Sequence, residues 1–104
     1  MANNNPPVKG VAFTFIASME DMSNPGSYKS TPTIAAGDFQ VSKDGGAYAN
    51  MTDIPVVTPA ASIDVQGVLT ATEMNADRVK VKAIDQTSPK EWADWTLVIY
   101  TTAA

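Results

Sequence analysis

The chain of 104 residues contains no cysteine and no histidine. Without cysteine, disulfides, thiolate nucleophiles and zinc sites of the thiolate kind are excluded. Without histidine, the commonest general base and the commonest metal ligand are also missing. Serine triads, cysteine–histidine dyads and zinc hydrolases are therefore ruled out, and we expect a protein that is not an enzyme and binds no cofactor or metal.

Basic residues are few: seven lysines and arginines stand against 11 aspartates and glutamates, for a net charge of −4. Binding to nucleic acid depends on clustered Lys and Arg. The one local cluster, Arg78, Lys80 and Lys82, alternates with apolar residues, a pattern typical of the solvated face of a strand. We therefore expect no nucleic-acid partner.

Long apolar runs are missing as well. No run approaches the roughly 20 residues that cross a bilayer. The first residues have neither the basic nor the apolar region of a signal peptide. We therefore expect no membrane partner and no secretion signal.

The first ten residues are rich in Asn, Pro and Gly, which favour turns and extended states and offer little to bury. This composition predicts an extended N-terminal arm over residues 1–10. The remaining length suits one hydrophobic core, so we expect a single domain over residues 11–104.

Apolar residues alternate with polar ones in short runs, which predicts strands. Pro55 and Pro59 bracket one run and place it at a sheet edge or beside a crossing point, since proline cannot donate to a ladder. Gly67 interrupts another run, and a bulge is one explanation. The last run is apolar on both faces, so it is either central in a sheet or covered by another molecule. The expected strands cover residues 11–18, 38–43, 47–51, 54–58, 63–69, 78–83 and 92–102.

Turn signals separate these strands. Asp44-Gly45-Gly46 predicts a hairpin turn, and Thr70 with Glu73 predicts a capped single helical turn. No segment of ten or more residues has a helical period. The sequence therefore predicts an all-β protein, a small antiparallel β-sandwich that is immunoglobulin-like or jelly-roll-like, in preference to a small closed barrel.

Aromatic side chains are the main candidates for a ligand site. Tyr48, Trp92 and Trp95 could form a platform on which a sugar ring stacks, yet two tryptophans in a domain of this size also suit the role of core anchors. Both interpretations stay open. The carboxylates are too few around Asp44 for a calcium loop, and Glu73 is expected to act as a cap.

Two segments are candidates for contacts with a partner. The polar arm is one, and the long connection over residues 19–37 is the other, because loops of that length are usually functional or held by a neighbour. The residues that we expect to make these contacts are Asn3, Asn4, Asn5, Pro6, Pro7, Pro25, Tyr28 and Pro32.

Residues 32–50 and 69–77 resemble a small β-domain common in structural proteins of tailed bacteriophages. There a P-T-x-A-x-G-D-x-x-x-S-x-D-G-G-x-x-x-N segment precedes an L-(S/T)-A-T-E-M turn, and both patterns occur here. The likeness spans about residues 10–102 and consists of turn and cap residues, so no catalytic set is carried over. Where such proteins often read Glu-Trp-Cys-Asp, this chain has Trp92-Ala93-Asp94-Trp95 and no thiol.

The resemblance implies a component of the virion, made in the cytoplasm of a host bacterium. We predict a non-enzymatic capsid decoration or cement subunit that binds neighbouring capsid proteins, since many weak copies on a lattice sum to durable attachment. Self-association into a homo-oligomer stays open. Two alternatives also stay open: a collar, tail or fibre-attachment component that binds neck or tail proteins, and a module that binds a host glycan.

Overall fold

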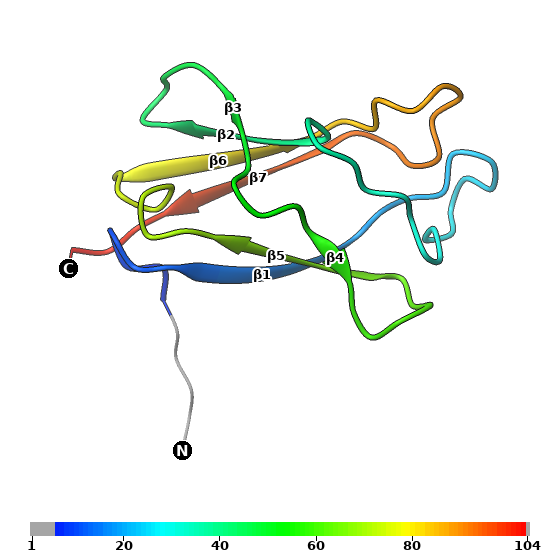
Figure 1. Ribbon diagram of the computed structural model, residues 1–104, viewed down its shortest axis with the longest axis horizontal. Helices are drawn as coiled ribbons and strands as arrows, with labels where there is room; N and C mark the ends of the chain where they lie inside the picture. The colour runs from blue at the N-terminus through cyan, green and yellow to red at the C-terminus, as the bar shows by residue number, and fades with distance from the viewer. Residues whose placement is uncertain (1–5, 104) are drawn as a thin grey trace.

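A computed structural model describes residues 6–103. Within this range the chain forms seven strands and no helix (Figure 1). The all-β class predicted from the sequence is confirmed. The strands are β1 (Phe13–Ser18), β2 (Phe39–Lys43), β3 (Ala49–Asn50), β4 (Val56–Val57), β5 (Asp64–Leu69), β6 (Arg78–Ala83) and β7 (Trp95–Tyr100).

The strands form two antiparallel sheets that pack against each other, as the predicted sandwich requires. One sheet has the order β1-β5-β4 and the other the order β3-β2-β6-β7. An immunoglobulin-type sandwich pairs its strands as A-B-E-D and C′-C-F-G. If β1 to β7 are lettered B, C, C′, D, E, F and G in chain order, the order found here is B-E-D and C′-C-F-G. Of the immunoglobulin-like and jelly-roll-like sandwiches that the sequence predicts, the topology therefore follows the immunoglobulin type. The described residues contain no strand in the place of A.

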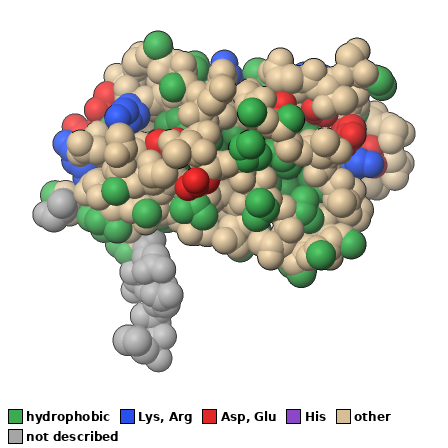
Figure 2. Space-filling model, viewed as in Figure 1, with side chains coloured by type: hydrophobic (Ala, Val, Ile, Leu, Met, Phe, Trp, Pro, Cys, Tyr) green, Lys and Arg blue, Asp and Glu red, His purple; other side chains and the backbone are tan. Residues whose placement is uncertain are grey.

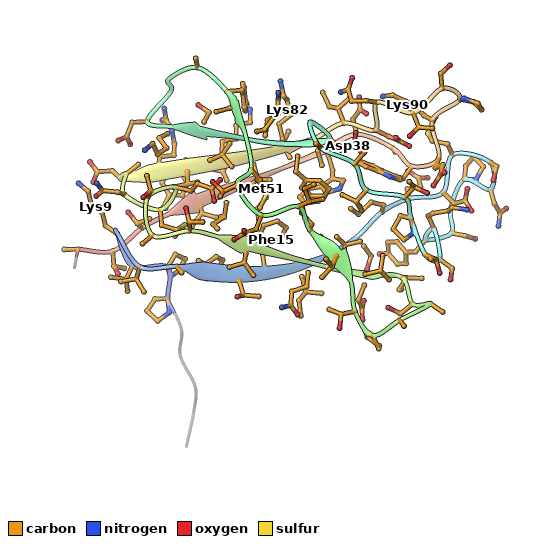
Figure 3. All side chains as sticks on the ribbon, viewed as in Figure 1. Lys9, Phe15, Asp38, Met51, Lys82 and Lys90 are labelled. Carbon is orange, nitrogen blue, oxygen red and sulfur yellow. The ribbon has the colours of Figure 1, made fainter. Side chains whose placement is uncertain are left out.

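The core lies between the sheets and is built by residues that alternate along each strand. In β5 and β6 every second side chain is buried and the others point outward. This period of two is the pattern that the sequence predicts. Figure 3 shows Phe15 and Met51 directed into the space between the sheets. The largest fully buried side chains are those of Trp92, Met19, Leu69, Met74, Val65, Val79, Val81, Asp38 and Asp85.

Aromatic rings occupy the centre of this core. Phe15 stacks near Phe39 with ring centroids 6.5 Å apart, and Trp95 meets both rings edge-on at 6.3 and 5.6 Å. Gly67 lies opposite Phe15 in regular register, so the bulge considered at this glycine is not formed. A Cβ atom at Gly67 would lie 2.3 Å from Cζ of the Phe15 ring. The glycine is therefore needed to seat the ring over β5, and the strand is not interrupted there.

The predicted turn at Asp44-Gly45 is present. Asp44 and Gly45 have φ angles of 49° and 79°, and the Gly46 N–H donates to the Lys43 carbonyl at 2.9 Å. Two central residues with positive φ define a type I′ turn, which suits a hairpin. The returning strand is shorter than the predicted 47–51. The turn is closed between Lys43 and Gly46, and the next paired residues are Val41 and Ala49. The chain advances by two residues on the first side of the hairpin and by three on the returning side. This extra residue delays pairing until β3.

The predicted cap at residues 70–75 is also confirmed. The Thr70 N–H donates to Glu73 Oε1 at 2.8 Å, and the Glu73 N–H donates to Thr70 Oγ1 at 3.2 Å. These reciprocal bonds form a capping box around one turn. The second carboxylate oxygen of Glu73 accepts the Thr52 N–H at 2.9 Å. The cap therefore also holds the segment that follows β3.

The short strand β4 lies at a sheet edge, as its flanking prolines predict. The last strand, β7, also lies at an edge, next to β6 alone, and a central place for it is therefore wrong. Trp95, Leu97 and Ile99 face the core, whereas Val98 is 42% exposed and Tyr100 is 72% exposed. Of the two explanations for its doubly apolar pattern, the central place is excluded and cover by another molecule stays a prediction.

The described part of the arm runs along the end of the chain. Val8 pairs with Thr102, the Lys9 N–H donates to the Thr102 carbonyl at 3.0 Å, and the Thr102 N–H donates to the Pro7 carbonyl at 2.8 Å. The Lys9 ammonium lies 3.2 Å from the Asp77 carboxylate. Residues 7–10 therefore bind their own domain.

Candidate functional site

Three loops gather at one end of the sandwich, away from the last described residues (Figure 1). They connect β1 to β2, β4 to β5, and β6 to β7, and of the three only the β1–β2 loop joins the two sheets. Of the contacts expected in the first loop, Pro25 and Tyr28 are exposed, with Tyr28 at 60%. Pro32 is buried, so a partner contact by Pro32 is wrong. In the arm, Pro6 is exposed, Pro7 is half-buried beside Thr102, and Asn3, Asn4 and Asn5 lie outside the described residues.

Two buried carboxylates hold this loop end together. Asp38 accepts the Ala35 N–H at 3.0 Å and the Gln86 N–H at 3.1 Å, and so joins the first loop to the last one. Asp85 accepts the N–H groups of Thr87 and Glu91 at 2.9 and 2.7 Å.

Asp85 is 2% exposed, and although burial opposes its charged form, these hydrogen bonds lower its pKa below the ordinary value. Sequence reasoning missed this role for both Asp38 and Asp85, because an aspartate beside a strand gives no sign of which backbone groups it will meet.

The predicted aromatic platform is not formed. Trp92 is fully buried and donates its indole N–H to the Thr33 carbonyl at 3.2 Å. Trp95 packs partly buried into the core, and its indole N–H has no acceptor among residues 6–103. Tyr48 is 36% exposed, with the Lys82 ammonium 4.0 Å from its ring centroid. The interpretation of the two tryptophans as core anchors is therefore confirmed, and Trp92 cannot stack on a ligand.

The outer face of the four-stranded sheet carries the basic cluster. Arg78, Lys80 and Lys82 point outward from β6, as the alternation predicts, and Figure 3 shows Lys82 directed away from the core. Across the register, Arg78 lies beside Tyr100 and Lys80 beside Val98. A shallow depression of about 400 Å³ follows this face, lined by Ser42, Gly45, Gly46, Tyr48, Arg78, Lys80, Val98 and Tyr100.

The outer face of the three-stranded sheet carries exposed apolar side chains among polar ones. Ile16, Gln66 and Val56 form one row across β1, β5 and β4. Ile16 is 66% exposed and Val56 is 57% exposed, and Ile54 nearby is 48% exposed. Figure 2 shows hydrophobic side chains at the surface over β4. Patches of this kind usually mark contacts with another macromolecule.

Comparisons with known proteins add nothing to this geometry. No protein-family model, curated protein or solved structure matches the chain. The resemblance to phage structural proteins therefore stays a prediction, and any functional conclusion depends on the two outer faces and the loop end.

Across residues 6–103 no group of three or more Asp and Glu side chains is placed to hold a metal ion. No helix in that range is long and apolar enough to span a membrane. A second depression of about 400 Å³ beside the 70–75 turn contains one carboxylate, Glu73, which already accepts two backbone N–H groups. The arrangement is suited to surface binding.

Proposed function

We propose that this chain is a non-enzymatic structural protein of a bacteriophage virion, a decoration or cement subunit that binds neighbouring capsid proteins. The observation that carries the proposal is the exposure of two apolar side chains, Ile16 and Val56, on either side of Gln66 on the three-stranded sheet. The sequence resemblance supplies the class of partner. The surface that contacts the capsid protein consists of the outer face of the three-stranded sheet and of Pro25 and Tyr28 at the loop end.

The row lies next to an unprotected sheet edge. Strand β1 is the outermost strand of its sheet and contains neither a charged residue nor a proline. Exposed edge strands are normally protected by such residues, because their free backbone groups invite pairing with another chain. Complete cover of Ile16 and Val56, which are 66% and 57% exposed, contributes about 1–2 kcal/mol for each side chain. A contact of this strength is weak alone and strong when repeated over a lattice.

The proposal is tested by the amount of the chain in purified phage particles. We expect a constant ratio to the major capsid protein, comparable to one copy per capsid subunit or per capsomer, by quantitative mass spectrometry. A small fixed number of copies would instead place the chain at the collar or tail. Failure to find the chain in particles would contradict a virion role altogether.

The attachment face is tested by adding one positive charge to it. We expect Ile16→Lys to weaken binding to undecorated shells by about tenfold or more, since a buried apolar contact is replaced by a desolvated charge. Ala71→Lys, at an exposed position in the 70–75 turn, adds the same charge elsewhere and is expected to bind like the wild type. Equal binding by both variants would exclude the β1 face as the attachment site.

A further inference from the structure

The outer face of the four-stranded sheet concentrates positive charge on an acidic protein. Arg78, Lys80 and Lys82 are three of the chain's seven basic residues, so the other residues carry four basic against 11 acidic groups, or −7. No carboxylate lies at an outward position of β2, β6 or β7 on this face. The ion pairs within residues 6–103 join Lys9 to Asp77 and Lys90 to Asp94, and neither involves the three cations.

Two of the three cations, Lys82 and Arg78, are held in place by their neighbours. The Lys82 ammonium lies over the Tyr48 ring at 4.0 Å, which is a cation–π contact. The Arg78 guanidinium lies over the Asp44-Gly45 turn: a Cβ atom added to Gly45 would be 3.1 Å from Arg78 Nη2. Alternate residues of a strand are about 7 Å apart, and the cations therefore form a row with regular spacing along β6. Less side-chain entropy is lost on binding when charged groups are already positioned.

A flat, exposed aromatic ring stands beside this row. Tyr100 is 72% exposed and lies opposite Arg78 in the register, and Val98 lies opposite Lys80 at 42% exposed. Together with Arg78 and Lys80 they contribute to the lining of the depression of about 400 Å³. The site thus offers anion recognition and an apolar stacking surface side by side, in a hollow that is open along the strand.

We propose that this face binds an acidic oligosaccharide, whose carboxylates meet Arg78 and Lys80 while a sugar ring stacks on Tyr100. The net charge of −7 elsewhere on the chain opposes densely charged polyanions such as nucleic acid and favours a ligand with sparse charge. The hollow contains no deep apolar pocket for the side chains of a peptide, whereas a sugar chain presents flat faces and hydroxyl groups. The inference does not depend on a virion role, and the site lies on the sheet opposite to the attachment face.

The test is calorimetric titration of the full chain with tri-galacturonic acid, with neutral maltotriose as the comparison. We expect binding of the acidic sugar that weakens as salt is raised, and no binding of maltotriose. Lys80→Gln and Tyr100→Ala are each expected to weaken binding about tenfold, the size of one charge-assisted or stacking contact. Lys90→Gln removes the same charge from an exposed loop and is expected to leave the affinity unchanged.

Three results would overturn the inference. The first is no binding of tri-galacturonic acid at millimolar concentration. The second is the same loss of affinity in Lys90→Gln as in Lys80→Gln, which would reduce the effect to net charge. The third is tighter binding of oligo-glutamate or of a short oligo-thymidylate than of the sugar, which would assign the face to a peptide or to single-stranded nucleic acid.

Discussion

Replacing Gly67 by alanine adds a single methyl group at the tightest contact in the core. The new Cβ atom would lie 2.3, 2.6 and 2.9 Å from three carbons of the Phe15 ring, closer than any real contact of this kind. The backbone of Gly67 has no positive φ, so the substitution causes no strain of its own in the main chain. The consequence must therefore come from displacement of the Phe15 ring.

The expected destabilisation follows from two opposing effects. Inserting a methyl group into a packed core costs about 1–3 kcal/mol, and here the ring can move only toward Phe39 and Trp95, which already contact it. Alanine also restricts the unfolded chain, which stabilises the fold by about 0.4–1 kcal/mol. We expect a net loss of about 1–2 kcal/mol in the free energy of unfolding, which corresponds to a fall in Tm of roughly 5–15 °C.

A double-mutant cycle separates the clash from other effects. In the Phe15→Leu background the ring is missing, so Gly67→Ala should become neutral or slightly stabilising, although Phe15→Leu is itself destabilising. Urea unfolding followed by tryptophan fluorescence gives the four free energies, because Trp92 is fully buried in the native state. The reasoning is refuted if Gly67→Ala costs the same in both backgrounds, or if it stabilises the wild type.

Three further substitutions test the interactions that hold the turns and loops. Glu73→Ala removes the acceptor of the Thr70 and Thr52 N–H groups and should lower the free energy of unfolding by about 1–2 kcal/mol, whereas Glu73→Gln should lower it less. Asp85 has a lowered pKa in the folded state, so its contribution to stability is complete above the unfolded value near 3.8 and is lost as the pH falls through the folded value. Asp85→Asn should therefore be destabilising in urea titrations at pH 7, and this destabilisation should shrink as the pH is lowered below 3.8. An effect independent of pH would contradict this. Trp92→Phe should destabilise by about 1–3 kcal/mol in thermal unfolding, since it leaves a cavity and an unpaired carbonyl.

Features set by neighbouring residues could be predicted from the sequence. The Asp44-Gly45 turn depends on two residues that tolerate positive φ, and the cap at Thr70 and Glu73 depends on groups three residues apart. The alternation in β5 and β6 likewise requires only a sheet with one buried face. In each case the physical cause lies within a few residues, and the structure confirms the prediction.

Features set by distant parts of the chain could not be predicted. Pro32 sits in a long connection and looks like a surface residue, yet the loop folds back and buries it. Asp38 and Asp85 receive hydrogen bonds from the loops at one end of the sandwich, and no local pattern indicates that these loops meet. The neighbours of the cations on β6 could not be predicted either. Alternation along the strand places Arg78 and Lys80 on an outward face, but Tyr100 and Val98 lie beside them only because β7 pairs with β6.

The pattern of β7 bears on the ligand that we propose for the outer face of the four-stranded sheet. Apolar residues occur on both faces of this strand, a pattern typical of a strand at the centre of a sheet. The strand lies instead at an edge, and its outer residues Val98 and Tyr100 are left exposed. Exposed apolar side chains reduce solubility, and here they stand beside unpaired cations in a hollow. The ligand that we propose for this face would account for both features at once.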